Sequence, residues 1–249
     1  MLRRLEEIIG CDIATADGNV GKVHDALFDR QKWAVRHLVV DTGNWLVGRQ
    51  VLVSPISVRN IDLNARVVHT DLTKQQLENA PGIAADEPVS RQYESTYYEH
   101  YGWPPYWAGP MLWGYWGAPA MVSYDRPITT AEEEMRAQAE ARQDENLHSF
   151  REVNGYTVEA SDGAMGDIED VIIDDETWKL SYVLVDTSKF LPGKDVLVPP
   201  ESVKAIIYNG SRVEIDMTKE ELKQQPEFTS LGALHEGQTE GPVMMSRPG

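Results

Sequence analysis

Hydrophobic and polar residues alternate in short runs over most of this chain. Runs such as VHDALFD at 23–29 and RHLVVDT at 36–42 have the length of strands, and turn residues separate them. Valine and isoleucine are frequent in these runs, which favours strands over helices. The pattern therefore predicts a mainly β protein.

The pattern occurs twice. Residues 9–58 align with residues 154–203 at an offset of 145 residues, and the match continues without a gap to Pro81 and Pro226. Many aligned positions are identical, and most of the others are conservative replacements. Self-similarity of this kind indicates a duplicated structural unit. We therefore predict two copies of one domain, at residues 1–82 and 148–228.

Turn residues at matched positions divide each copy into strands. An Asp-Gly pair predicts a tight hairpin whose glycine takes a positive φ, and a glycine three residues later suits a bulge or a close backbone approach. The repeated aspartates lie beside turns or strand ends, where aspartate commonly caps the local backbone. We assign turn or cap roles to Asp17, Gly18, Gly21, Asp41, Gly48 and Thr73, and to Asp162, Gly163, Gly166, Asp186, Gly193 and Thr218.

A short helix is expected at the end of each copy. Thr73 and Thr218 are each followed three residues later by Gln or Glu, which is the pattern of a capping box. Pro81 and Pro226 then stop the helix. Several short strands followed by such a helix predict a small closed or nearly closed barrel in each copy.

These motifs resemble the PRC-barrel domain. They are LVVDT or VLVDT, then a glycine turn, then VLVSP or VLVPP followed by Ser-Val, and earlier DGNVGKVHDALFD or DGAMGDIEDVIID. The family includes the cytoplasmic domain of the photosynthetic reaction-centre H subunit and the C-terminal domain of the ribosome maturation factor RimM. The resemblance covers both copies and implies two small PRC-type β-barrels in tandem.

An aromatic, Pro/Gly-rich linker is predicted between the copies, at residues 83–127. Residues 101–124 carry no charge, and their prolines and glycines exclude a helix that crosses a bilayer. The aromatic side chains either fold back onto the barrels or stay exposed to bind a partner protein or a membrane interface. The residues assigned to that interaction are Trp103, Tyr106, Trp107, Trp113, Tyr115 and Trp116.

A spacer helix is predicted at 128–147. Thr130 suits the N-cap with Glu133 three residues later, and Ala, Glu, Arg and Gln follow throughout the segment. After the second copy, we expect a disordered tail at residues 229–249.

Charge separates the two copies. The net charge of −17, with no basic run beyond Arg3-Arg4, argues against nucleic-acid binding. Residues 1–82 hold ten basic and ten acidic residues, whereas residues 146–228 hold eight and seventeen, a net charge of −9. Either the charges on solvent-exposed surfaces have diverged without functional consequence, or the acidic copy binds a basic surface of a partner. Neutralising Glu159, Asp167 and Glu169 together would test the second alternative.

The sequence shows no pattern typical of catalysis or metal binding. The histidines have no His-x-His or helical i, i+4 spacing, and none recurs in the other copy. The single cysteine, Cys11, excludes an internal disulfide and aligns with Tyr156, which favours a packing role. Phosphate-binding glycine loops and nucleophile elbows are also absent from the sequence. We predict a protein that is not an enzyme and holds no cofactor or metal.

The sequence also supports expectations about the cellular location of the protein and about how its two copies associate. The N-terminus lacks the apolar core of a signal peptide, and no apolar run has the length of a membrane helix. We expect a cytoplasmic protein, at most peripheral to a membrane. The copies either pair edges or faces as a pseudo-dimer, form a homo-oligomer, or behave as independent domains.

Three functions remain open. The first is a non-catalytic scaffold or adaptor that binds protein partners through its barrel surfaces. The second, implied by the resemblance, is a subunit like the reaction-centre H subunit, which supports electron and proton transfer at a membrane. The third is a small-molecule binding or enzymatic cleft between the barrels.

Overall fold

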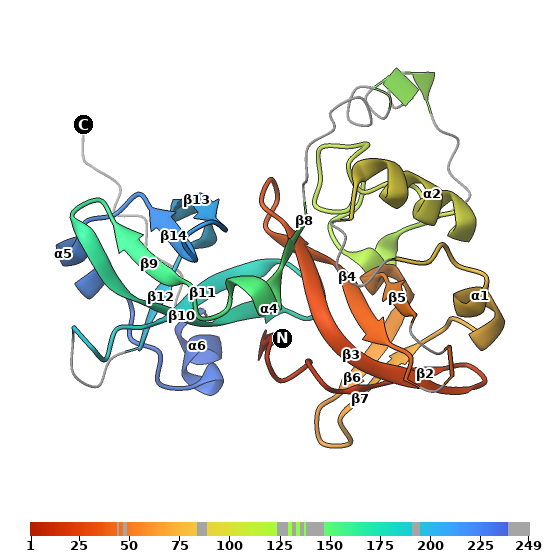
Figure 1. The fold of residues 1–249 in the computed structure, drawn as a ribbon, viewed down its shortest axis with the longest axis horizontal. Coiled ribbons are helices and arrows are strands. Elements are labelled where there is room, and N and C mark those ends of the chain that lie inside the picture. The colour runs from red at the N-terminus through yellow and green to blue at the C-terminus, as the bar shows by residue number, and fades with distance from the viewer. Residues whose placement is uncertain are drawn as a thin grey trace, which may run out of the picture.

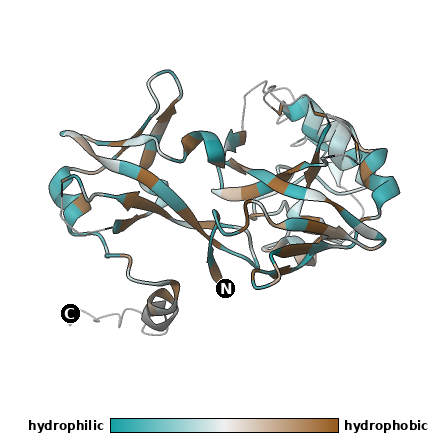
Figure 2. Ribbon diagram, turned by 60° about the horizontal axis from the view of Figure 1, so that its bottom comes forward, coloured by the Kyte–Doolittle hydropathy of each residue, from teal (hydrophilic) through white to brown (hydrophobic). Residues whose placement is uncertain are grey.

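The computed structural model describes residues 1–43, 45–46, 49–83, 89–123, 129–130, 133–134, 137, 147–190 and 195–238. Its strands form two seven-stranded sheets, which Figure 1 shows in two neighbouring lobes. We call residues 1–123 half 1 and residues 147–238 half 2. Figure 2 shows hydrophobic and hydrophilic residues interspersed along the strands of both halves. The prediction of a mainly β protein is confirmed.

Sheet 1 has the strand order β5-β4-β3-β2-β7-β6. All neighbours are antiparallel except β2 and β7, which are parallel. The 3-10 helix η1 (Pro55–Ser57) joins β5 to β6, the two ends of this order, so the chain leaves one end of the sheet and re-enters at the other. The strands are β2 (Asp12–Thr15), β3 (Gly18–Asp29), β4 (Ala34–Asp41), β5 (Gln50–Val53), β6 (Val58–Asp62) and β7 (Val67–Thr70).

Sheet 2 repeats this arrangement strand for strand. Its order is β12-β11-β10-β9-β14-β13, with the parallel pair at β9 and β14 and with η3 (Pro200–Ser202) between the end strands. The strands are β9 (Thr157–Ala160), β10 (Gly163–Asp174), β11 (Leu180–Asp186), β12 (Asp195–Val198), β13 (Val203–Ile207) and β14 (Arg212–Ile215). The closing helices are α1 (Lys74–Glu78) and α5 (Lys219–Lys223), each with a complete capping box at Thr73 or Thr218.

Glycine is required where the long strand of each sheet approaches its neighbour. A Cβ atom on Gly21 would lie 2.1 Å from the carbonyl oxygen of Asp41, and one on Gly166 would lie 2.4 Å from that of Asp186. No side chain fits such a space, so these glycines fix how closely the strands pack. The hairpin glycines Gly18 and Gly163 have φ of 135° and 121°. Gly48 and Gly193 lie outside the described residues.

Aspartates at the turns bind nearby backbone. Asp17 accepts a hydrogen bond of 2.8 Å from the backbone N–H of Lys74, and Asp162 accepts the equivalent bond from Lys219 at the same distance. These bonds tie each hairpin to the start of the closing helix. At the ends of β4 and β11, the side chains of Asp41 and Asp186 each accept a hydrogen bond from the backbone N–H of the second residue after them, at 2.9 and 2.7 Å.

The seventh strand of each sheet comes from the other half. Strand β1 (Leu2–Arg4) pairs with β10 of sheet 2, and β8 (Leu147–Ser149) pairs with β3 of sheet 1. Figure 1 shows β1 and β8 lying between the two lobes. We call this arrangement the reciprocal strand exchange.

The halves also meet at the turns that precede β4 and β11. Ala34 forms a β-bridge with Lys179, its own equivalent at the offset of 145. The backbone N–H of Val35 donates to the backbone carbonyl of Trp178 at 2.9 Å. The backbone N–H of Leu180 donates to the backbone carbonyl of Trp33 at 2.7 Å. Because one cluster of buried hydrophobic residues extends through both halves, they share a core.

The two sheets have different covers. On sheet 2, Leu231 and Leu234 of α6 (Leu231–Gln238) pack against Ile172, Leu184 and Leu197. The prediction that residues 229–249 are disordered was therefore wrong for 231–238, because these leucines cover an apolar face; residues 239–249 lie outside the described residues.

On sheet 1 the cover is α2 (Arg91–Tyr101), followed by residues 102–123, which we call the aromatic cap. The segment predicted as an extended linker thus contains a helix, and the aromatic cap includes the 3-10 helix η2 (Pro119–Met121). Most of the spacer helix predicted at 128–147 lies outside the described residues. Its last residue, Leu147, begins β8, which leads into α4 (Phe150–Val153).

Candidate functional site

Helix α2 is the base on which the aromatic cap rests. The Ser90 side chain accepts the N–H of Tyr93 and starts the helix, and Gly102, at φ 69°, ends it in the left-handed conformation. Tyr97 is fully buried; its hydroxyl donates to the carbonyl of Leu52 and accepts the N–H of Ser54, both at 3.1 Å. These bonds hold α2 against the end of β5.

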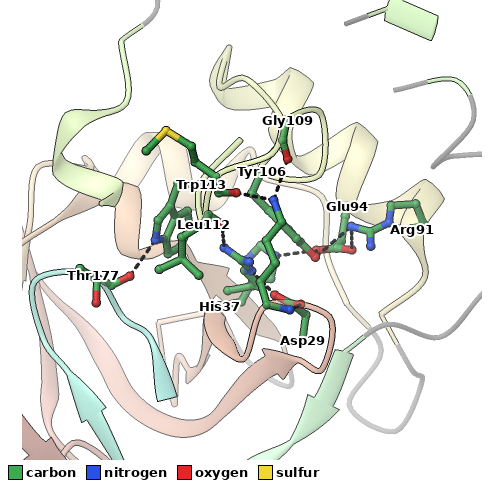
Figure 3. A network of polar contacts seen from close by, with 12 residues as sticks. Asp29, His37, Arg91, Glu94, Tyr106, Gly109, Leu112, Trp113 and Thr177 are labelled. Atoms are coloured by element: carbon green, nitrogen blue, oxygen red, sulfur yellow. Dashed lines mark hydrogen bonds and ion pairs between the residues drawn. The ribbon is translucent and has the colours of Figure 1, made fainter. Parts of the chain in front are cut away.

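Arg36 on β4 belongs to a buried polar network. Figure 3 labels several of its members, among them Asp29, Glu94 and Leu112. The Arg36 side chain is fully buried, where it forms an ion pair with Asp29 and donates to the carbonyl of Leu112 at 2.8 Å. Its guanidinium carbon lies 3.9 Å from the ring centre of Tyr106 and 4.8 Å from that of Trp113. The buried charge is therefore paired by a carboxylate and stacked on aromatic rings, which offsets its desolvation.

Glu94 on α2 forms the second part of the network. Its carboxylate accepts hydrogen bonds from Arg91 at 2.8 Å and from the Tyr106 hydroxyl at 3.0 Å. Nε2 of His37 lies 3.3 Å from the same carboxylate. Burial lowers the pKa of His37, so we assign a neutral ring that donates from Nε2 to Glu94.

Two further bonds fasten the aromatic cap. Nζ of Lys32 donates to the carbonyl oxygens of Gly109, at 2.8 Å, and Met111. Burial, and next the charge of Arg36, lower the pKa of Lys32 to about 8. Nε1 of Trp113 donates to the carbonyl of Thr177 at 2.8 Å, so the cap also contacts half 2.

The polar network belongs to half 1. At the offset of 145, the equivalents of Arg36 and His37 are Ser181 and Tyr182. Tyr182 packs beside the apolar residues that α6 covers. The face of sheet 1 that the aromatic cap covers therefore differs from the equivalent face of sheet 2, which α6 covers, at these two positions of one strand.

The structure buries much of the predicted interaction segment. Trp103, Tyr106 and Trp113 are 7%, 3% and 1% exposed. The alternative in which they stay exposed to bind a partner was therefore wrong, because their rings pack on α2 and around Arg36. The other three residues of the assignment, Trp107, Tyr115 and Trp116, are half-buried.

The outward side of the aromatic cap remains partly apolar. Met111 is 48% exposed and Met121 is 63% exposed, among the most exposed large hydrophobic side chains of the described residues. Methionine is flexible and polarizable, which suits a surface that adapts to another protein. The network beneath holds the backbone that carries Met111 through Lys32 and Arg36.

Sequence reasoning missed Arg36, His37, Arg91 and Glu94. A signal existed for the first two, because Arg-His interrupts an otherwise apolar strand, AVRHLVVD, at positions where the second copy has Ser-Tyr. A charged residue in a buried strand needs a partner. Asp29 pairs with Arg36 from the neighbouring strand, whereas Glu94 and the carbonyl of Leu112 come from residues 91–113, which no local pattern identifies.

The acidic test positions of half 2 have partners within the chain. Glu159 pairs with Arg212 at 3.1 Å and Asp167 with Lys189 at 2.6 Å. Glu169 pairs at 2.8 Å with Arg4, which comes from half 1. Part of the basic surface that meets the acidic copy is thus the N-terminal strand of this chain.

An open hollow of about 530 Å³ lies on half 2, over β9, β13 and β14. Its charged lining includes Arg212, which lies within ion-pair distance of both Glu159 and Glu214. Within the described residues, no three His, Cys, Asp or Glu side chains gather as a metal site. None of the described helices is both long enough and apolar enough to span a bilayer.

Comparison with known proteins identifies the family. The family model of the PRC-barrel domain matches residues 2–77 and 145–222. The chain belongs to the PRC-barrel domain family and carries two tandem PRC-barrel domains, so the resemblance inferred from the motifs is confirmed.

A relative is an uncharacterized protein of Deinococcus radiodurans, 31% identical over 77 residues, which make up 31% of this chain and 27% of the relative. The match therefore spans about a quarter of the length of that protein.

Proposed function

We propose that this protein is a non-catalytic adaptor that holds two unlike protein-binding surfaces in a fixed relative orientation. The observation that carries the proposal is the reciprocal strand exchange, through which each sheet is completed by the other half. Two barrels on a flexible tether would not fix the direction in which their surfaces point. A shared core and exchanged strands fix that direction.

The first surface is the outward side of the aromatic cap. The cap carries the exposed Met111 and Met121 together with half-buried aromatic residues, a composition that is enriched in protein interfaces. The second surface is half 2, whose negative charge favours a basic partner. The protein would act in the cytoplasm, and at a membrane surface if its partner is located there.

The two alternative functions have less support. A ligand cleft between the barrels would need open space at the junction, where Phe28, Trp33, Phe150 and Trp178 are all buried. A role like that of the reaction-centre H subunit would use surface carboxylates for proton entry. Several of these carboxylates on half 2 are held in ion pairs.

Affinity capture with the full chain tests the proposal. We expect the immobilised protein to capture a defined partner from cells that express it naturally, and the double variant Met111→Ser/Met121→Ser to lose that partner at least tenfold. The matched control is Phe190→Ser, which removes a 47% exposed apolar side chain from half 2. Equal capture by both variants would contradict the assignment of the cap as a binding surface. Co-purification of pigment or quinone would instead support the reaction-centre alternative.

A further inference from the structure

The two exchanged strands occupy equivalent sites in the same register. Leu2 lies opposite Asp174 on sheet 2, and Leu147 lies opposite Asp29 on sheet 1. Both members of the first pair are related to those of the second by the offset of 145. Each half therefore offers an acceptor site for the N-terminal strand of a copy of itself.

A buried aspartate anchors the incoming chain at each site. Asp170 accepts the N–H of Glu6 at 3.1 Å and Nε of Arg4 at 2.6 Å. In sheet 1, Asp25 accepts the N–H of Arg151 at 3.0 Å and the hydroxyl of Ser149. Because the anchors correspond at both ends, the junction has approximate two-fold symmetry, with the bridge between Ala34 and Lys179 on its axis.

A two-fold junction does not require that its two halves belong to one chain. We infer that the same junction forms between two copies of this chain, with half 1 of each copy paired with half 2 of the other. In such an exchanged dimer every junction contact of the single chain is retained, so the two forms differ mainly in entropy and in the path of the connection. The sequence between Ser123 and Leu147 has 23 residues, which reach on the order of 75 Å when extended.

Charge at the acceptor sites decides which halves pair. Arg3 of β1 forms an ion pair with Asp175, and Arg4 pairs with Glu169 and Asp170. At the offset of 145, Asp175 corresponds to Arg30 of half 1 and Glu169 corresponds to His24.

If two copies of half 1 exchanged strands, Arg3 would meet Arg30, a repulsive contact. If two copies of half 2 did so, the neutral Ser149 would replace Arg4 beside Asp170, and a buried carboxylate would lose its cation. Pairing of unlike halves is therefore favoured, and the partner that fits the junction is a second copy of this chain, oriented head to tail.

A charge exchange between two variants tests this inference. One variant carries Arg3→Glu and the other carries Asp175→Arg, so Arg4 keeps its pairing with Glu169 and Asp170 in every combination. Each variant has like charges facing each other at its own junction. When the two are refolded together, half 1 of the first matches half 2 of the second, and the unchanged halves match each other.

We expect the mixture to form a heterodimer with twice the chain mass of 28.0 kDa, measured by light scattering, with at least fivefold more dimer than either variant alone. The control exchanges the charges of Asp167 and Lys189, an ion pair within half 2 that leaves the junction intact, and its mixture with the wild type should form no more dimer than the wild type alone. A mixture that stays monomeric, although both variants show β-sheet circular dichroism, would overturn the inference.

A second measurement keeps the junction residues of the exchanged strands intact. Ala34 and Lys179 form a pair without mutual hydrogen bonds, flanked by the bonds from Val35 and Leu180, and such pairs have the short Cα separation that suits a disulfide. In the variant Ala34→Cys/Lys179→Cys, oxidation after dilute refolding should give cross-linked monomer, and after refolding at high concentration cross-linked dimer. Cross-linked monomer alone at every concentration would contradict exchange between chains.

Discussion

Half 1 and half 2 share a backbone framework but differ in what covers it. Strand order, hairpin glycines and capping boxes correspond one for one. The outer face of sheet 1, however, receives α2 and the aromatic cap, whereas that of sheet 2 receives α6. The framework tolerates little change because a side chain at Gly21 or Gly166 would collide with the neighbouring strand. Residues on the covered face of each sheet contact the cover, so the residue and its cover can change together.

A buried charge on a sheet can determine which segment covers it. Arg36 pairs with Asp29 within its own sheet, and the cover supplies what else the two side chains need: the Glu94 carboxylate for His37, and the Leu112 carbonyl and ring faces for Arg36. Ser181 and Tyr182 impose no such demand, and the leucines of α6 are sufficient on that side.

The largest effect is expected at Arg36. Arg36→Ala leaves Asp29 as a buried carboxylate without its cation and removes the stacking partner of Tyr106, so it should lower the free energy of unfolding by about 3–5 kcal/mol. The equivalent change in half 2, Ser181→Ala, should cost less than about 0.5 kcal/mol. Urea unfolding measures both values, and similar costs would contradict the role of Arg36 in selecting the cap.

The anchors of the exchanged strands should differ in strength. Asp170→Ala removes the partner of Arg4 as well as of a backbone N–H, and we expect a loss of about 2–4 kcal/mol. Asp25→Ala removes only neutral donors, so about 1–3 kcal/mol is expected. Unfolding in urea at neutral pH measures which of the two variants loses more stability. A greater loss for Asp25→Ala would show that charge does not strengthen the site on sheet 2.

Acid should weaken the strand β8 site more than the β1 site. Burial, and next the charge of Arg30, lower the pKa of His148 to about 4, from 6.5 in the unfolded chain. Because the folded pKa is depressed, the unfolded chain binds a proton first, and stability falls as pH decreases from about 6.5 to about 4.

After allowance for solvent screening we expect His148 to contribute about 1–2 kcal/mol of this loss. The variant His148→Gln should flatten the dependence in a urea titration at pH 7, 6 and 5. The equivalent position on β1 is Arg3. An unchanged slope in the variant would exclude His148 as the source.

Alkali should tighten the aromatic cap. Lys32 has a pKa of about 8 in the folded protein and about 10.5 in the unfolded chain, so the unfolded state holds the extra proton between these values. Stability should therefore rise with pH from about 8 to 9.5, by about 1 kcal/mol after screening, and the rise should vanish in Lys32→Met. Half 2 has Thr177 at this position. A rise that persists in the variant would assign it to another group.

The smallest effects should be equal in the two halves. Thr73→Ala and Thr218→Ala each break a complete capping box on a five-residue helix, and each should cost about 1 kcal/mol. Thermal unfolding of the two variants measures the difference between them. Costs that differ by more than twofold would show that the shared framework is not energetically equivalent.

Local patterns predicted much of the framework. The Asp-Gly hairpins, the close-approach glycines and the helices after Thr73 and Thr218 all follow from residues near one another in sequence. The exchange did not follow, because a three-residue strand such as β1 has no periodicity and its partner lies more than a hundred residues away. Helix α2 was missed although Ser90 and Gly102 mark its ends, since the aromatic content of the segment dominated the interpretation.

The reciprocal strand exchange has a consequence for folding during translation. Leu2 is synthesised more than a hundred residues before its neighbour Asp174, and β3 is likewise made long before β8. Neither barrel can complete its sheet during most of translation, and contacts of such long sequence separation slow folding. The N-terminal barrel therefore remains unfinished until the C-terminal barrel emerges, and both become native in a single late step.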